Sequence, residues 1–116
     1  MAVDTLKKGS IEMLMLHMLR EGDAHGYQLV QMLEERSKGK LTVQEGSLYP
    51  LLYRMADEGY IAGYNVQVET PKGKKRSRVM YRLQPAGVER LEQLKKEYQE
   101  VREGIQNVLT GGTMCE

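Results

Sequence analysis

The residues most capable of chemistry in this sequence are cations on one short stretch, TPKGKKRSR, at positions 70–78. The whole chain has 17 Lys and Arg against 16 Asp and Glu, a formal charge of +1, so the rest carries −4 once these five cations are set aside. Positive charge at this density repels itself unless it stays in water or meets a polyanion such as a nucleic acid. The pattern predicts either a solvated loop or a phosphate-binding surface. Its members are Lys72, Lys74, Lys75, Arg76 and Arg78.

Residues suited to catalysis or metal binding are scarce. The chain has two histidines, His17 and His25, and one cysteine, Cys115. No Cys/His group has metal-ligand spacing, and no glycine-rich phosphate loop follows a strand. Nearly all the acidic residues lie beside Lys or Arg on expected helical faces, as on a solvated surface. We therefore predict a protein that is not an enzyme and needs no metal or cofactor, with Cys115 incidental in a polar tail.

Length and composition indicate one small domain. A chain of 116 residues with 41% hydrophobic residues builds a modest core and gains from burying a face against a second copy. No run approaches the roughly 18 apolar residues of a membrane span. The start of the chain lacks a secretory signal, and a lone cysteine forms no internal disulfide. These features predict a cytoplasmic protein without membrane association.

Two helices are expected before residue 40. The first runs from Ser10, a suitable cap, to Gly22, and it is apolar on almost every side. Such a helix must be covered from more than one direction, which suggests a partner beyond its own domain. The second helix follows, with Asp23 as the expected cap, and ends at residues 37–39.

The third helix is the candidate for contact with DNA. Two starts are open: near Ser47, which puts Pro50 in the first turn, or at Thr42 through a Thr-x-x-Glu capping box, with a bend at Pro50. One face is apolar, with Leu48, Leu51, Leu52 and Met55. The outer side chains of its leading half are small or form hydrogen bonds, and helix–turn–helix proteins place such residues in the major groove. The predicted contacts are Gln44, Ser47, Tyr49, Pro50, Tyr53 and Arg54.

Two strands joined by the basic turn complete the unit. Residues 60–68 and 77–83 are rich in β-branched and aromatic side chains, and Pro71 and Gly73 mark the turn between them. The order helix, helix, helix, strand, strand predicts an α+β, mostly α, winged helix-turn-helix domain over residues 1–84. The basic hairpin is its wing, placed to reach a DNA backbone.

A heptad seam marks the last helix, expected over residues 85–110. Its apolar positions recur at spacings of 3, 4, 3, 4 and 3, and are Leu91, Leu94, Tyr98, Val101, Ile105 and Val108. About 24 helical residues form a rod of roughly 36 Å, longer than a domain with a radius of gyration of about 13 Å. The seam therefore predicts dimerisation, with packing on its own domain as the alternative. Residues 111–116 are expected to form a flexible tail.

Three motifs resemble the PadR family of bacterial transcriptional regulators: HGYQL at 25–29, GSLYPLLYRMADEGYI at 46–61, and the hairpin closing on YRLQPAG at 81–87. The likeness extends over roughly residues 10–110. The short last helix resembles the smaller branch of the family, which has one C-terminal helix. It implies a winged-helix homodimer that binds double-stranded DNA, represses its target genes and is released by a small phenolic or flat aromatic effector. It also implies that Tyr49, Pro50 and Arg54 belong to the DNA-facing helix. The last helix would pack on the first helix of the other chain, including Leu14 and Met18.

One departure from that family concerns ligand binding. Multidrug-sensing members hold a flat ligand between tryptophans of the two chains, whereas this sequence has no Trp and no Phe. Tyr98 takes the corresponding place in the seam, where it can stack on a ligand with less aromatic area or act as a plain interface residue. Met13 and His17 are expected to line the same space, although methionines of this kind also fill cores.

Two other functions stay open at this level. A winged-helix module could use the basic turn to bind an acidic protein surface, which suits the nearly neutral net charge. A small-molecule carrier could use the dimer cavity without any nucleic acid.

Overall fold

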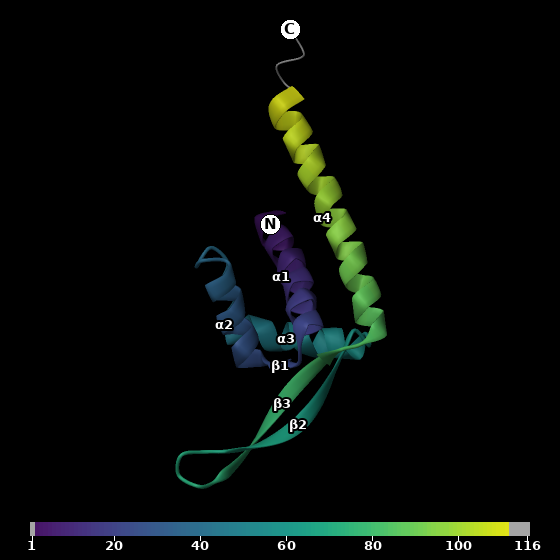
Figure 1. Ribbon diagram of the computed structural model, residues 1–116. Coiled ribbons are helices and arrows are strands. Elements are labelled where there is room, and N and C mark those ends of the chain that lie inside the picture. The colour runs from purple at the N-terminus through teal and green to yellow at the C-terminus, as the bar shows by residue number, and fades with distance from the viewer. Residues whose placement is uncertain (1, 112–116) are drawn as a thin grey trace.

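The computed structural model describes residues 2–111, with side chains described from Gly9 onward. Its elements, in chain order, are α1 (Ala2–Glu21), β1 (Ala24–His25), α2 (Gly26–Arg36), α3 (Glu45–Asp57), β2 (Ile61–Glu69), β3 (Lys75–Leu83) and α4 (Pro85–Gly111). The molecule is elongated, 72 × 29 × 25 Å, because the β2–β3 hairpin and α4 project from opposite ends of the helical centre (Figure 1). The predicted α+β, mostly helical architecture is confirmed.

The first helix forms the centre of the protein. Its buried side chains are Ile11, Glu12, Met15, Leu16, Met18 and Leu19. α4 packs along one side of α1 and α2 lies on the other (Figure 1). Much of its apolar circumference is therefore covered within the chain, so that feature alone does not require a partner. The helix also begins at Ala2, so Ser10, the expected cap, lies inside it.

The second helix is capped by His25 and not, as predicted, by Asp23. His25 has extended backbone angles, and its Nδ1 accepts the backbone N–H of Gln28 at 3.3 Å. The Gln28 side chain in turn accepts the His25 N–H at 3.0 Å, so each residue satisfies a backbone donor of the other. Asp23 is drawn away by partners on the sheet, described below.

The third helix begins at Glu45, between the two predicted starts. Its cap residue Gln44 makes no side-chain capping bond, so the expected Thr42 capping box does not form. Pro50 consequently lies in the second turn, where it has no N–H for the Gly46 carbonyl. Gly46 is exposed, and water can satisfy that carbonyl. The predicted inward face is confirmed, with Leu48, Leu52 and Met55 fully buried and Leu51 half-buried.

The sheet has the strand order β1-β3-β2, with both pairings antiparallel. β2 and β3 pair over nine positions, from Ile61 opposite Leu83 to Glu69 opposite Lys75. The expected hairpin is confirmed but is longer, because Lys75 and Arg76 belong to β3 and not to the turn. β1 pairs Ala24 with Tyr81, and a strand of two residues is too short for any sequence periodicity to reveal.

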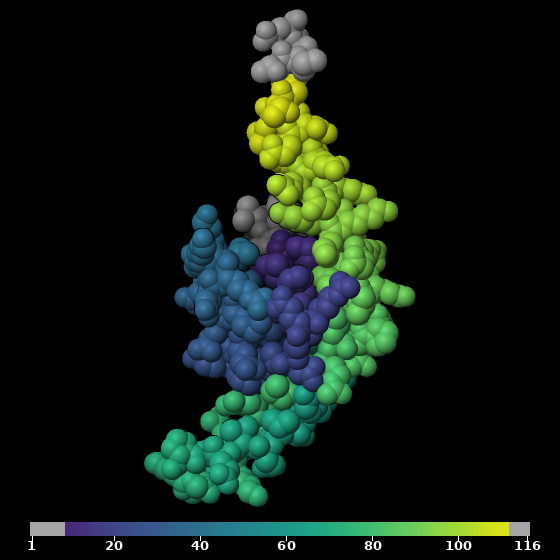
Figure 2. Space-filling model, viewed as in Figure 1, coloured from purple at the N-terminus to yellow at the C-terminus, as the bar shows by residue number. Residues whose placement is uncertain are grey.

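A close backbone contact fixes the start of α4 at the base of the hairpin. The Tyr60 carbonyl accepts the backbone N–H of Gln84 at 2.9 Å. A Cβ on Gly87 would lie 2.1 Å from that carbonyl oxygen, so only glycine fits there. The distal end of α4 projects beyond the rest of the domain, at the yellow end of Figure 2. Within residues 2–111, no helix is long and apolar enough to cross a membrane.

Candidate nucleic-acid interface

The outer face of α3 is open to solvent. Of the six predicted contact residues on this helix, Tyr49 is half-buried and the other five are exposed: Gln44, Ser47, Pro50, Tyr53 and Arg54. The helix crosses the lower end of the domain, beside the base of the hairpin and away from the free end of α4 (Figure 1). This face therefore presents small and hydrogen-bonding groups to any partner that approaches from that end.

The two tyrosines of α3 have different surroundings. The Tyr49 ring packs on Gly26 so closely that a Cβ there would lie 2.9 Å from the ring, which ties α3 to the start of α2. Tyr53 is 60% exposed, and its ring centroid is 6.3 Å from that of Tyr49. Of the two predicted contacts, Tyr53 is therefore the more accessible. Both tyrosines lie near Tyr81 on β3, and burial, followed by the proximity of Tyr53 and Tyr49, raises the pKa of Tyr81.

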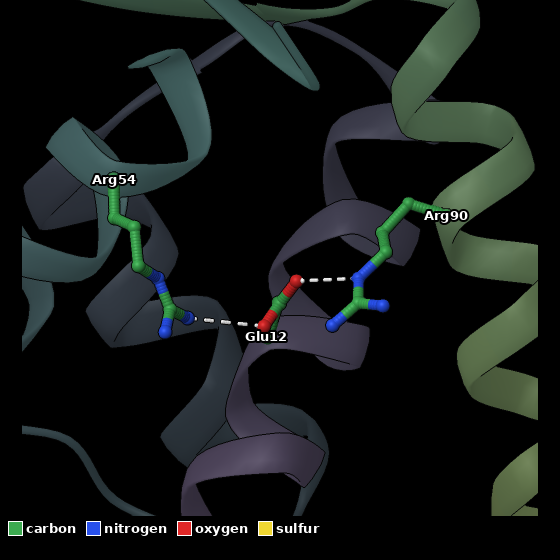
Figure 3. A network of polar contacts seen from close by, with 3 residues as sticks. All are labelled: Glu12, Arg54 and Arg90. Atoms are coloured by element: carbon green, nitrogen blue, oxygen red, sulfur yellow. Dashed lines mark hydrogen bonds and ion pairs between the residues drawn. The ribbon is translucent and has the colours of Figure 1, made fainter. Parts of the chain in front are cut away.

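Arg54 is engaged within the protein. Its Nη2 donates to Oε1 of Glu12 at 3.0 Å, while Nε of Arg90 donates to Oε2 of the same carboxylate at 2.9 Å (Figure 3). The Glu12 side chain is only 8% exposed, so this one carboxylate joins α1, α3 and α4 in the core. The Arg54 side chain remains 61% exposed, and its predicted contact with DNA stays a prediction.

The hairpin tip displays the basic cluster. Thr70 closes the turn by accepting the N–H of Gly73 at 2.9 Å and bonding with Lys74, and Gly73 adopts a left-handed φ of 79°. Lys72 and Lys74 lie in this turn, and Lys75 and Arg76 start β3. All four are exposed, and none has an ion-pair partner within the described part of the chain. The paired strands of nine residues are roughly 27 Å long, and only their base is held by β1 and the core, so the charged tip projects from the domain.

The base of the hairpin carries a second polar group. Asp23 accepts from the Tyr64 hydroxyl at 2.6 Å and from Nε of Arg82 at 3.1 Å, and these two bonds lower the pKa of Asp23. Nη1 of Arg78 lies 3.2 Å from Nε2 of His25. Burial, followed by the charge of Arg78, lowers the pKa of His25. Arg78 is therefore half-buried against β1, unlike the cations at the tip.

A groove of about 430 Å³ lies between α1 and α4, far from the hairpin. Tyr98 and Met13 line it as predicted, together with Ser10, Leu94, Val101 and Ile105. His17 does not line it, because it lies beside Glu21 with Nε2 3.5 Å from the carboxylate. Two of the three residues predicted to bind a ligand therefore line one groove, and ligand binding there stays a prediction.

The heptad seam divides into a buried and an exposed part. Leu91 and Met18 are buried in the protein's own core, and Leu94 and Leu14 are half-buried. The distal part is bare, since Tyr98, Val101 and Ile105 are about half exposed and Val108 is 76% exposed. Only the distal residues are fully available to a second chain.

Comparison with known proteins identifies the family. The sequence profile of the transcriptional regulator PadR-like family matches residues 15–93, more than half of the chain. The chain belongs to the PadR-like family of transcriptional regulators. Among solved structures, it is similar to a PadR-like transcriptional regulator from Bacillus cereus, with 31% identity, 91% of this chain and 97% of that chain covered, and a TM-score of 0.70.

Two further structures support the same fold. A PadR family transcriptional regulator from Eggerthella lenta is 27% identical, covers 94% of this chain and 89% of its own, and gives a TM-score of 0.76. A transcriptional regulator from Clostridium thermocellum is 25% identical. The match covers 89% of this chain and 96% of that chain, with a TM-score of 0.77. The winged-helix prediction and the prediction of a non-enzymatic regulator are thereby confirmed for this PadR-family chain.

Two residues of this regulator were not recognised from the sequence as organising groups. Glu12 is the one acid in the apolar run IEMLMLHML, and that position is a sequence signal of a paired buried charge. His25 caps α2 through its bond with Gln28, a role that the sequence predicts for Asp23.

Proposed function

We propose that this PadR-family protein is a homodimeric repressor that binds a near-palindromic operator and is released by a small aromatic or phenolic ligand. The observation that carries the proposal is the position of two surfaces. The exposed face of α3 and the unpaired cations of the hairpin lie at one end of the molecule, and bare apolar side chains of α4 lie at the other.

Contact with DNA is divided between α3 and the hairpin. Gln44, Ser47 and Tyr53 project from α3, where they can bond to base edges, and Tyr49 and Pro50 shape the surface between them. The exposed cations at positions 72, 74, 75 and 76 supply phosphate contacts, which position the protein without reading sequence. Arg54 fixes α3 through the bond of its Nη2 to Glu12, and its exposed side chain keeps other N–H donors for DNA.

Dimerisation uses the distal half of α4. Tyr98, Val101, Ile105 and Val108 repeat at heptad spacing and are 47–76% exposed, a continuous apolar stripe that a monomer would leave in water. Two copies joined there would present two α3 helices to half-sites about one helical turn, ~34 Å, apart. Tyr98, Val101 and Ile105 of this stripe also line the groove against α1, which has a volume typical of ligand sites, and Tyr98 offers a ring for a flat ligand.

The test is the salt dependence of DNA binding by the Lys74→Gln, Lys75→Gln, Arg76→Gln triple variant, measured on genomic fragments selected by the wild-type protein. Each lost phosphate contact should reduce the slope of log K against log[salt] by about 0.9, with similar weakening on all sequences. Lys95→Gln, Lys96→Gln on exposed positions of α4 is the control. Unchanged affinity and slope in the triple variant would exclude the hairpin from DNA binding. Absence of DNA binding by the wild type, together with retention of an acidic protein, would favour the alternative interaction module.

A further inference from the structure

The imidazole of His25 lies between two N–H donors. Its Nδ1 is 3.3 Å from the backbone nitrogen of Gln28, and its Nε2 is 3.2 Å from Nη1 of Arg78. A neutral imidazole has one nitrogen that accepts and one that donates. Whichever nitrogen carries the proton, one of these two contacts therefore brings a donor against a donor.

The charge at this point is also uncompensated. Arg82, on the same face of β3, is paired with Asp23 at 3.1 Å, whereas no acidic side chain among the described residues pairs with Arg78. Since burial and Arg78 lower the pKa of His25, the ring is neutral at pH 7, and Arg78 supplies the positive charge. The cap bond uses Nδ1 as the acceptor, which leaves the Nε2 proton directed at the guanidinium. An anion placed beside both groups would accept from each of them.

The position of the pair identifies the anion. His25 directly precedes Gly26, against which Tyr49 of α3 packs, and Arg78 is two residues along β3 from Arg76, the last cation of the exposed tip cluster. The pair therefore lies between the exposed face of α3 and the hairpin tip. A duplex that touches both would pass a backbone phosphate across it.

We propose that His25 and Arg78 together bind one backbone phosphate of the operator, midway between the contacts of α3 and those of the hairpin tip. This inference rests on the proposed DNA-binding function. His25 thus has two roles, because its Nδ1 caps α2 while its Nε2–H holds the phosphate.

His25→Asn separates these roles. Asparagine is a good helix cap, so it keeps the start of α2 but removes the Nε2 donor. Arg78→Gln removes the charge of the partner, and Lys95→Gln, an exposed cation on α4, is the control. Thermal unfolding of each variant verifies that the fold is retained.

Binding is measured by fluorescence anisotropy over a range of salt, on a fragment selected by the wild-type protein. Arg78→Gln should lower the salt slope by about 1.8, because the dimer loses one phosphate contact, worth about 0.9, in each half-site. His25→Asn removes a neutral donor, so it should weaken binding with little change in slope. In the Arg78→Gln background the same substitution should cost little further affinity, because both residues hold one phosphate. Lys95→Gln should match the wild type.

A scan with single methylphosphonates, which neutralise one phosphate at a time, locates the contact. We expect one position in each half-site at which the substitution weakens wild-type binding but leaves Arg78→Gln unaffected. If the wild type binds no DNA, the proposed function fails and this inference fails with it. If the wild type binds DNA while both single variants keep its affinity and slope, or no methylphosphonate position distinguishes Arg78→Gln, the phosphate site alone is refuted.

Discussion

Replacing Glu12 by glutamine removes the charge of a carboxylate that joins three helices. Its side chain is 8% exposed, and its oxygens accept from Arg54 at 3.0 Å and from Arg90 at 2.9 Å. A hydrogen bond to a charged group stabilises by about 1.5–3 kcal/mol. The Arg54 side chain is 61% exposed, so solvent reduces its share to about 0.5 kcal/mol. We expect Glu12→Gln to lower the free energy of unfolding by about 2–3 kcal/mol, or roughly 10 °C in Tm.

Glu92→Gln is the matched control for this prediction. Glu92 accepts from Arg20 at the same 2.9 Å, but the two side chains are 56% and 50% exposed, so the pair contributes about 0.5 kcal/mol at most. Both variants are unfolded in urea and by heat, followed by circular dichroism at one protein concentration, because a dimer has a concentration-dependent Tm. Equal losses in the two variants would refute the claim that burial gives the Glu12 contacts their value.

Three further predictions concern the base of α4, the cap of α2 and the exposed stripe. Gly87→Ala should cost about 3 kcal/mol in urea unfolding, since its Cβ would meet the Tyr60 carbonyl; a gain, as helix propensity alone suggests, would exclude that contact. As pH falls, His25 is protonated in the unfolded chain before it is protonated in the folded chain, so the free energy of unfolding should decrease below the ordinary histidine pKa of 6.5. His25→Asn should flatten this part of the curve of stability against pH, and an unchanged curve would show that another group causes the decrease. Ile105→Glu should give a monomer in light scattering, and a persistent dimer would place the interface on another surface.

Patterns confined to one element could be predicted from the sequence. The spacing of Leu48, Leu52 and Met55 marks the buried face of α3, because helical periodicity depends only on neighbours within the helix. The cap of α2 could not be chosen in this way, since Asp23 and His25 are both local candidates. Asp23 is bound by Tyr64 and Arg82, which are 41 and 59 positions away, and only the fold brings them together.

Partners across the fold explain the remaining differences. Arg54 faces outward by helical phase, yet its guanidinium reaches Glu12, 42 positions earlier in the chain. The heptad pattern places Leu91 in the same seam as Ile105, although Leu91 is fully buried in its own chain and Ile105 is half exposed. Periodicity identifies an apolar stripe, but it does not say whether the same chain or another one covers it.

The most direct measurement asks whether α3 and the hairpin tip contact one duplex. In a protein carrying Cys115→Ser, an iron chelate attached at Ser47→Cys or at Lys74→Cys cleaves DNA close to its point of attachment. On an operator fragment selected by the wild type, we expect both chelates to cut in the same half-site, within about one helical turn, ~34 Å, of each other. Localised cutting from Ser47→Cys with no localised cutting from Lys74→Cys would contradict a shared DNA surface.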